Sequence, residues 1–114
     1  MTDEGGGLVV RAPNHLGELV LALPALSHAA TAETDAGRRL SVQLVAGLEP
    51  ILDMAGLEVE RLPLENRRDV LAGGLQIRRT GARRGILLTP SASSAVMFRL
   101  GGLELSLIHI SEPT

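Results

Sequence analysis

Short apolar runs alternate along this chain with longer segments in which apolar residues recur at helical spacing. A compact apolar run bounded by turn residues is typical of a strand buried on both faces. The predicted strands are Leu8 to Val10, Leu40 to Val45, Val59 to Leu64 and Gly85 to Thr89. Pro63 makes the third of them a candidate edge strand, because proline cannot donate to a sheet ladder.

The segments between these runs favour helices. In the first, apolar residues recur at Leu19, Leu23, Leu26 and Ala30, which suits one face of a helix. Pro24 predicts either a bend in that helix or a restart at the proline. The helices are expected at Glu18 to Ala30, Leu48 to Ala55, Asp69 to Thr80 and Ser91 to Leu100, and residues 31–39 are expected to form a polar connection.

Alternating strands and helices predict an α/β fold, with a parallel sheet covered by helices on both faces. The first half of a doubly wound sheet has the strand order 3-2-1-4, and ligands bind at the carboxyl ends of its strands. Two turns occupy that position, Pro13 to Glu18 and Thr89 to Ser94. The 114 residues fit a single domain after a flexible start at residues 1–7.

Charge and composition exclude several classes of protein. The 13 acidic and 11 basic residues nearly cancel, which disfavours nucleic-acid binding. The absence of cysteine excludes disulfides and thiolate metal sites, and the three scattered histidines suggest no metal cage. The apolar stretch from Leu19 to Leu26 is too short to span a bilayer, and the acidic start lacks a signal peptide. We therefore expect a cytoplasmic protein.

The familiar nucleotide and hydrolase motifs are missing. No Gly-x-Gly-x-x-Gly follows the first strand, and neither a P-loop nor a Gly-x-Ser-x-Gly elbow occurs. The distinctive segment is instead VVRAPNHLGELVLALPAL at residues 9–26. It resembles the opening of glycosyltransferase family nine, the ADP-heptose lipopolysaccharide heptosyltransferases, in which a strand, x-Gly-Asp and Ala-Leu-Pro-Ala-Leu follow in that order. TPSASSA at residues 89–95 and FRLGG at 98–102 resemble a later segment of the family.

The resemblance covers residues 8–104, about the first third of a family member. It implies a GT-B enzyme with two Rossmann-like domains, of which this chain is a truncated amino-terminal domain on the acceptor side. The missing domain would bind ADP-heptose, so the fragment alone is expected to be inactive. The acceptor would be a lipopolysaccharide core or related lipid-linked saccharide, reached from the inner face of the bacterial inner membrane by peripheral contact. No cofactor or metal is implied.

Glu18 stands where the family has its catalytic Asp, so the resemblance assigns it the role of the base that deprotonates the acceptor hydroxyl. The alternative is a carboxylate that only stabilises the start of a helix through its dipole. Gly17 permits a tight turn or the close approach of a ligand. Arg11 is the cation nearest the crevice, unless it pairs with a surface acid.

The remaining candidates for acceptor binding are Asn14, His15, Ser91 and Ser93. Each also has a simpler interpretation, since Asn14 suits a turn, a loop histidine is commonly solvated, and a serine before a helix commonly caps it. Family members often carry a lysine in the serine-rich turn, and this chain has none.

Residues 105–114, LSLIHISEPT, resemble the peptide that a translated sequencing adapter produces, and they are expected to be foreign to the protein. The alternative is a real fifth strand, because Leu107, Ile108 and Ile110 have strand propensity. If the tail is foreign, Leu107 to Ile110 could still pair with the edge of the fourth strand. A different function also stays open, namely a stand-alone α/β binding module without catalysis.

Overall fold

The structure, a computed structural model, describes residues 7–65, 69–88, 97–102 and 104–107. Its elements in chain order are β1 Leu8–Arg11, α1 Leu16–Asp35, β2 Leu40–Val45, the 3₁₀ helix η1 Ala46–Leu48, α2 Glu49–Met54, β3 Glu60–Leu64, α3 Val70–Thr80, β4 Arg84–Leu87 and β5 Glu104–Leu107. Residues 97–100 are also helical.

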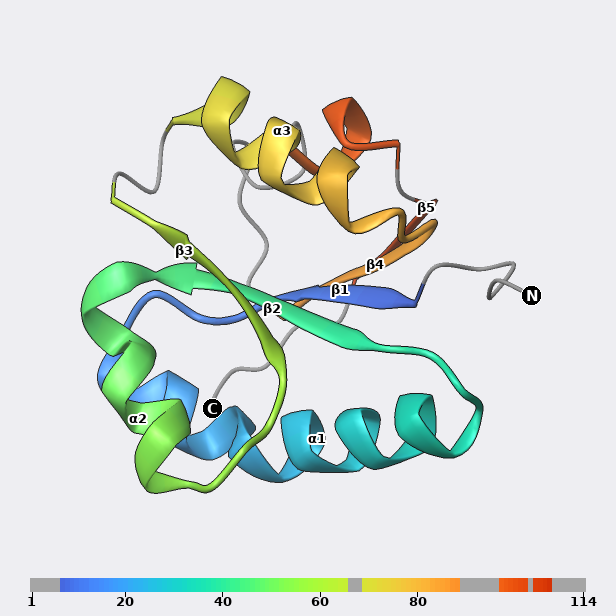
Figure 1. Cartoon of the computed structure of the whole chain (residues 1–114). Coiled ribbons are helices and arrows are strands. Elements are labelled where there is room, and N and C mark those ends of the chain that lie inside the picture. The colour runs from blue at the N-terminus through green and yellow to red at the C-terminus, as the bar shows by residue number, and fades with distance from the viewer. Residues whose placement is uncertain (1–6, 66–68, 89–96, 103, 108–114) are drawn as a thin grey trace.

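All five strands form one parallel sheet in the order β3-β2-β1-β4-β5 (Figure 1). The fold is therefore α/β and compatible with a Rossmann-like fold, as the sequence predicts. The order of the first four strands is also the predicted one. Pro63 lies in β3, which is an edge strand. Proline has no amide hydrogen to donate, and an edge strand tolerates this because it has a neighbouring strand on one side only.

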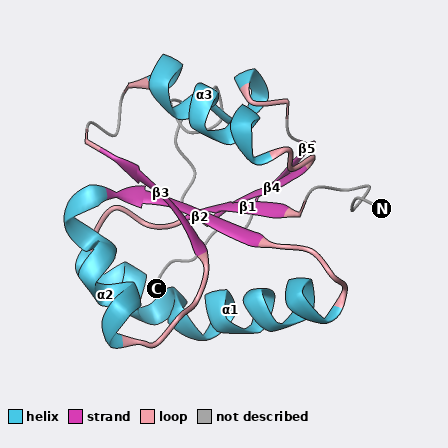
Figure 2. Ribbon diagram, in the orientation of Figure 1, coloured by secondary structure: helices cyan, strands magenta, loops and turns pink. Residues whose placement is uncertain are grey.

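Helices cover both faces of the sheet (Figure 2). The cluster on the α1 and α2 side includes the register partners Val10 and Val42, packed with Leu26 of α1 and Leu52 of α2. Alternate strand residues point the other way, and there Val9, Leu62 and Leu87 join Ile77 of α3 and Phe98 in a second buried cluster. The two-sided burial explains why the central strands β1 and β2 are mostly apolar.

Helix α1 differs from the prediction. It begins at Leu16, continues through Pro24 and ends at Asp35. Pro24 is exposed, and the buried residues Leu19, Ala22 and Leu26 hold the helix against the sheet on both sides of it. This packing outweighs the one backbone hydrogen bond that a proline removes. The helix does not restart at Pro24, and the predicted polar connection begins only after residue 35.

Other boundaries differ by a few residues. The helix predicted from Leu48 to Ala55 extends from Glu49 to Met54, and the 3₁₀ helix η1 precedes it. Strand β4 starts one residue earlier than predicted, at Arg84, and ends at Leu87. Of the predicted last helix, only residues 97–100 lie within the described part of the chain.

Strand β5 pairs with β4 in parallel, with Leu87 opposite Leu107. Three of its four residues belong to the segment that resembles a translated adapter. The outer edge of β4 is therefore covered by a strand that begins three residues before Leu107, the first residue of the tail segment expected to pair there.

Candidate functional site at the carboxyl ends of the strands

Backbone pairing fixes the point where the chain leaves β1. Just past the strand, the Ala12 amide donates to the Gln43 carbonyl at 2.9 Å, and the Leu88 amide donates to the Arg11 carbonyl at 3.2 Å. Both neighbours of β1 thus hold its carboxyl end. The chain then passes through a short turn into α1, so the turn lies at the sheet edge where ligands of open α/β sheets bind.

Arg11 is the last residue of β1 and only 1% exposed. Its register partners are Gln43 in β2 and Leu87 in β4, so its side chain leaves the sheet on the α3 side. The Arg11 guanidinium donates through Nη2 to Asn14 Oδ1. Arg11 is therefore a buried residue bonded to the turn rather than a surface cation, and Asn14 has a specific contact that fixes the turn.

Gln43 is fully buried beside Arg11. Its Nε2 lies 3.4 Å from both the Gly73 carbonyl and Gln76 Oε1, and Gln76 Nε2 donates to the Pro63 carbonyl at 2.6 Å. These contacts tie β2, β3 and α3 together. Gln43 Oε1 has no hydrogen-bond partner within the described ranges. The sequence signal that we missed is an amide in the middle of the apolar run LSVQLV.

Glu18 lies in the first turn of α1 and is half-buried. His15 is the N-cap residue and is exposed, and its side chain makes no capping hydrogen bond. The first amides of α1 consequently find no acceptor in the N-cap side chain, and they carry the positive end of the helix dipole. Asn14, His15 and Glu18 thus come from one short stretch at the carboxyl edge of the sheet.

Gly17 is exposed and lies in α1 without a positive φ, so the turn does not require glycine. This corrects the tight-turn interpretation. A Cβ atom built there meets nothing within 4 Å. Open space above Gly17 is compatible with the other interpretation, close approach of a ligand. Ser91 and Ser93, the candidates from the second turn, lie outside the described residues.

A separate hollow of about 410 Å³ lies at the opposite, amino-terminal edge of the strands. It is lined by Ala30, Thr34, Arg38, Arg39, Leu40, Glu58, Val59 and Glu60. Arg39 and Glu60 form an ion pair across 3.2 Å, and Arg38 is paired with Glu33. Both arginines of the hollow are thus engaged in ion pairs, and the hollow lies away from the carboxyl ends of the strands, where ligands of open α/β sheets bind.

Within the described part of the chain, no helix is both long and apolar enough to cross a membrane, and no group of three or more histidine and acidic residues could hold a metal ion. Comparison of the chain with protein-family models, curated proteins and solved structures finds no match in any of the three.

Proposed function

We propose that this chain is the acceptor-side domain of an inverting glycosyltransferase that transfers a heptose-type sugar from ADP-heptose to a lipopolysaccharide-core or related lipid-linked acceptor. The observation that carries the proposal is the position of Glu18. This carboxylate, in the segment that resembles the heptosyltransferases, lies in the first turn of the helix after β1, at the ligand-binding edge of a parallel sheet.

In this reaction the Glu18 carboxylate takes the proton of an acceptor hydroxyl. The hydroxyl oxygen attacks the anomeric carbon of the donor sugar, and the nucleoside diphosphate leaves with the electrons of the broken bond. Glu18 has one more methylene than the aspartate of the family, which gives it a longer reach. The Arg11 to Asn14 hydrogen bond supports the proposal because it holds the turn that leads to this carboxylate.

The donor would bind to a second, carboxyl-terminal domain, so we expect no turnover from residues 1–114 alone. The lipid-linked acceptor would draw the enzyme to the inner face of the bacterial inner membrane as a peripheral protein. Asn14 and His15 would contact the acceptor from the turn, with Ser91 and Ser93 on the neighbouring turn. No step of this chemistry uses a metal ion, so turnover should survive chelation of divalent ions.

The test requires the full-length parent protein, ADP-heptose and a core acceptor that lacks its heptose. Glu18→Gln keeps the shape of the side chain and removes the base, so turnover should fall by about 10²-fold or more. Glu49→Gln is the matched control, because Glu49 is also an acidic residue in a first helical turn, that of α2. Near-normal turnover in Glu18→Gln would refute the assignment of the base. A gene without a donor domain would favour the non-catalytic binding module.

A further inference from the structure

The outer side of α3 and the adjoining helical residues 97–100 form a surface that is both apolar and basic, here called the α3 surface. Leu71 is 79% exposed, Leu75 50% and Leu100 43%, which is unusual for leucine in three neighbouring positions. The surface consists of Leu71, Leu75, Arg78 and Arg79 of α3 together with Arg99 and Leu100.

Helical spacing and a close helix contact create this surface. Leu71, Leu75 and Arg79 are four residues apart and share one stripe of α3. Gly74 lets the second helix come near, since a Cβ there would lie 3.0 Å from Leu100 Cβ. Arg78 Nη2 donates to the Leu100 carbonyl at 2.7 Å and joins the two helices. The three leucines therefore belong to one continuous surface.

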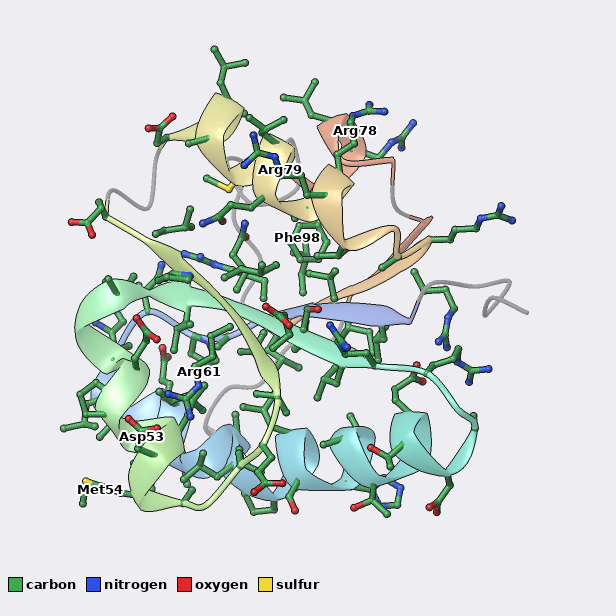
Figure 3. The ribbon with its side chains drawn as sticks, viewed as in Figure 1. Asp53, Met54, Arg61, Arg78, Arg79 and Phe98 are labelled. Carbon is green, nitrogen blue, oxygen red and sulfur yellow. The ribbon has the colours of Figure 1, made fainter. Side chains whose placement is uncertain are left out.

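The named residues of the surface carry only positive charge. The sequence has no acidic residue from Val70 to Leu88 or from Met97 to Gly102. Asp69 lies just before this range as the N-cap of α3, where its carboxylate accepts a hydrogen bond from the Ala72 amide. The opposite helical layer provides a contrast, since Met54 of α2 is 83% exposed but lies next to Asp53 (Figure 3). In Figure 3 Arg78 and Arg79 lie on the far side of the sheet from Met54. The exposed leucines of the opposite layer, Leu16 and Leu21, belong to α1, which contains no lysine or arginine. Exposed leucines and arginines therefore share a helix in α3 but not in α1.

We propose that the α3 surface binds a lipid surface with anionic headgroups, where the leucines enter the acyl boundary and the arginines contact the phosphates. A second copy of the chain fits less well, because a symmetric contact would bring like charges together. The biological setting rests on the proposed function, in which the acceptor is lipid-linked. The first turn of α3, with Leu71, follows the carboxyl end of β3, at the sheet edge that carries Glu18.

The test is cosedimentation of the 114-residue chain with vesicles of phosphatidylcholine alone or mixed with phosphatidylglycerol. The chain should bind the mixed vesicles, and added salt should weaken the binding. Leu71→Ser with Leu75→Ser should abolish it. Arg79→Gln should weaken it roughly fivefold, the equivalent of about 1 kcal/mol for one basic residue near an anionic surface. Met54→Ser, which removes an equally exposed apolar side chain elsewhere, should bind like the parent chain.

Absence of binding to the mixed vesicles, or equal binding by the leucine variant, would overturn the proposal. So would a dimer in light scattering that the leucine variant dissociates, because the surface would then join two copies. Loss of binding in Arg79→Gln alone, with the leucine variant unaffected, also overturns it, because charge alone would then hold the chain to the headgroups and no leucine would enter the acyl boundary. Urea unfolding checks that each variant is folded. The vesicles contain no saccharide, so this result does not depend on whether the parent is a glycosyltransferase.

Discussion

Replacing Glu33 by glutamine tests how α1 is fastened to the sheet. Glu33 lies in the last turns of α1 and is only 4% exposed. Arg38 Nε lies 3.0 Å from Glu33 Oε1, and Arg84 Nη2 lies 2.8 Å from the same oxygen. Arg84 begins β4, so this carboxylate connects segments that are 51 residues apart. Glu33→Gln keeps the size of the side chain and removes its charge.

The pKa of Glu33 gives the effect a characteristic pH dependence. Burial alone would raise this pKa, but the hydrogen bonds and positive charges of Arg38 and Arg84 outweigh burial and hold it below its ordinary value of 4.5. The unfolded chain therefore binds a proton more readily than the folded one. The contribution of Glu33 to stability is complete above the ordinary pKa, and it is lost as the pH falls through the lowered one.

The exposure of the two arginines sets the magnitude. Removing one partner of a fully buried ion pair costs about 3–5 kcal/mol. Here the Arg38 and Arg84 side chains are 32% and 43% exposed, so water can solvate the charges that lose their partner. Hydrogen bonds to charged groups contribute about 1.5–3 kcal/mol. We expect Glu33→Gln to lower the free energy of unfolding by about 2 kcal/mol at neutral pH.

Urea unfolding followed by circular dichroism measures this loss. With a slope of about 1–3 kcal/mol per molar urea, the midpoint should fall by roughly 1 M. Glu60→Gln is the matched control: its ion pair with Arg39 is exposed, at 47% and 72%, and should contribute less than about 1 kcal/mol. The reasoning is refuted if Glu33→Gln and the parent chain unfold at the same urea concentration. It is also refuted if their difference persists in acid, where Glu33 is protonated.

Three further changes test the packing, the first turn and the sheet edge. Gly101→Ala should destabilise the chain by about 1–3 kcal/mol in urea unfolding, because a Cβ there would lie 2.7 Å from Ile77 Cβ. Gly47→Ala is the control and should have little effect, since a Cβ at residue 47 would meet nothing within 4 Å. Gly17→Ala should preserve or slightly raise thermal stability, since Gly17 is helical and a Cβ there meets nothing. If turnover of the full-length parent nevertheless falls, the added methyl group blocks the close approach of a ligand. Deleting residues 105–114 removes most of β5, so light scattering should detect self-association, and a monomer would contradict this view of the edge.

The sheet was predictable because its signals are local. A strand buried on both faces is mostly apolar, so runs such as LVV and LSVQLV identify β1 and β2 without knowledge of their neighbours. The position of Pro63 similarly predicted an edge strand, since a missing amide is tolerated only there. These short-range rules gave the fold class, and the strand order followed from the usual order of a doubly wound sheet.

The length of α1 and the burial of Arg11 were not predictable from local signals. Thr31 to Asp35 is polar, and its helical state accompanies the contact between Glu33 and Arg84, which is distant in sequence. An arginine at the end of a strand usually suggests the surface, whereas Arg11 lies under the α3 layer and bonds to Asn14. Both features depend on tertiary contacts, which override residue preferences.

The two ends of the sheet differ in how their polar groups are used, and this difference separates stability from the proposed activity. At the amino-terminal end, Glu33 satisfies two arginines, so its loss should appear in unfolding. At the carboxyl-terminal end, the side chain of the exposed N-cap residue His15 makes no capping bond, so the first amides of α1 are left for water or a ligand. Glu33→Gln should therefore change stability more than turnover, and Glu18→Gln should do the reverse.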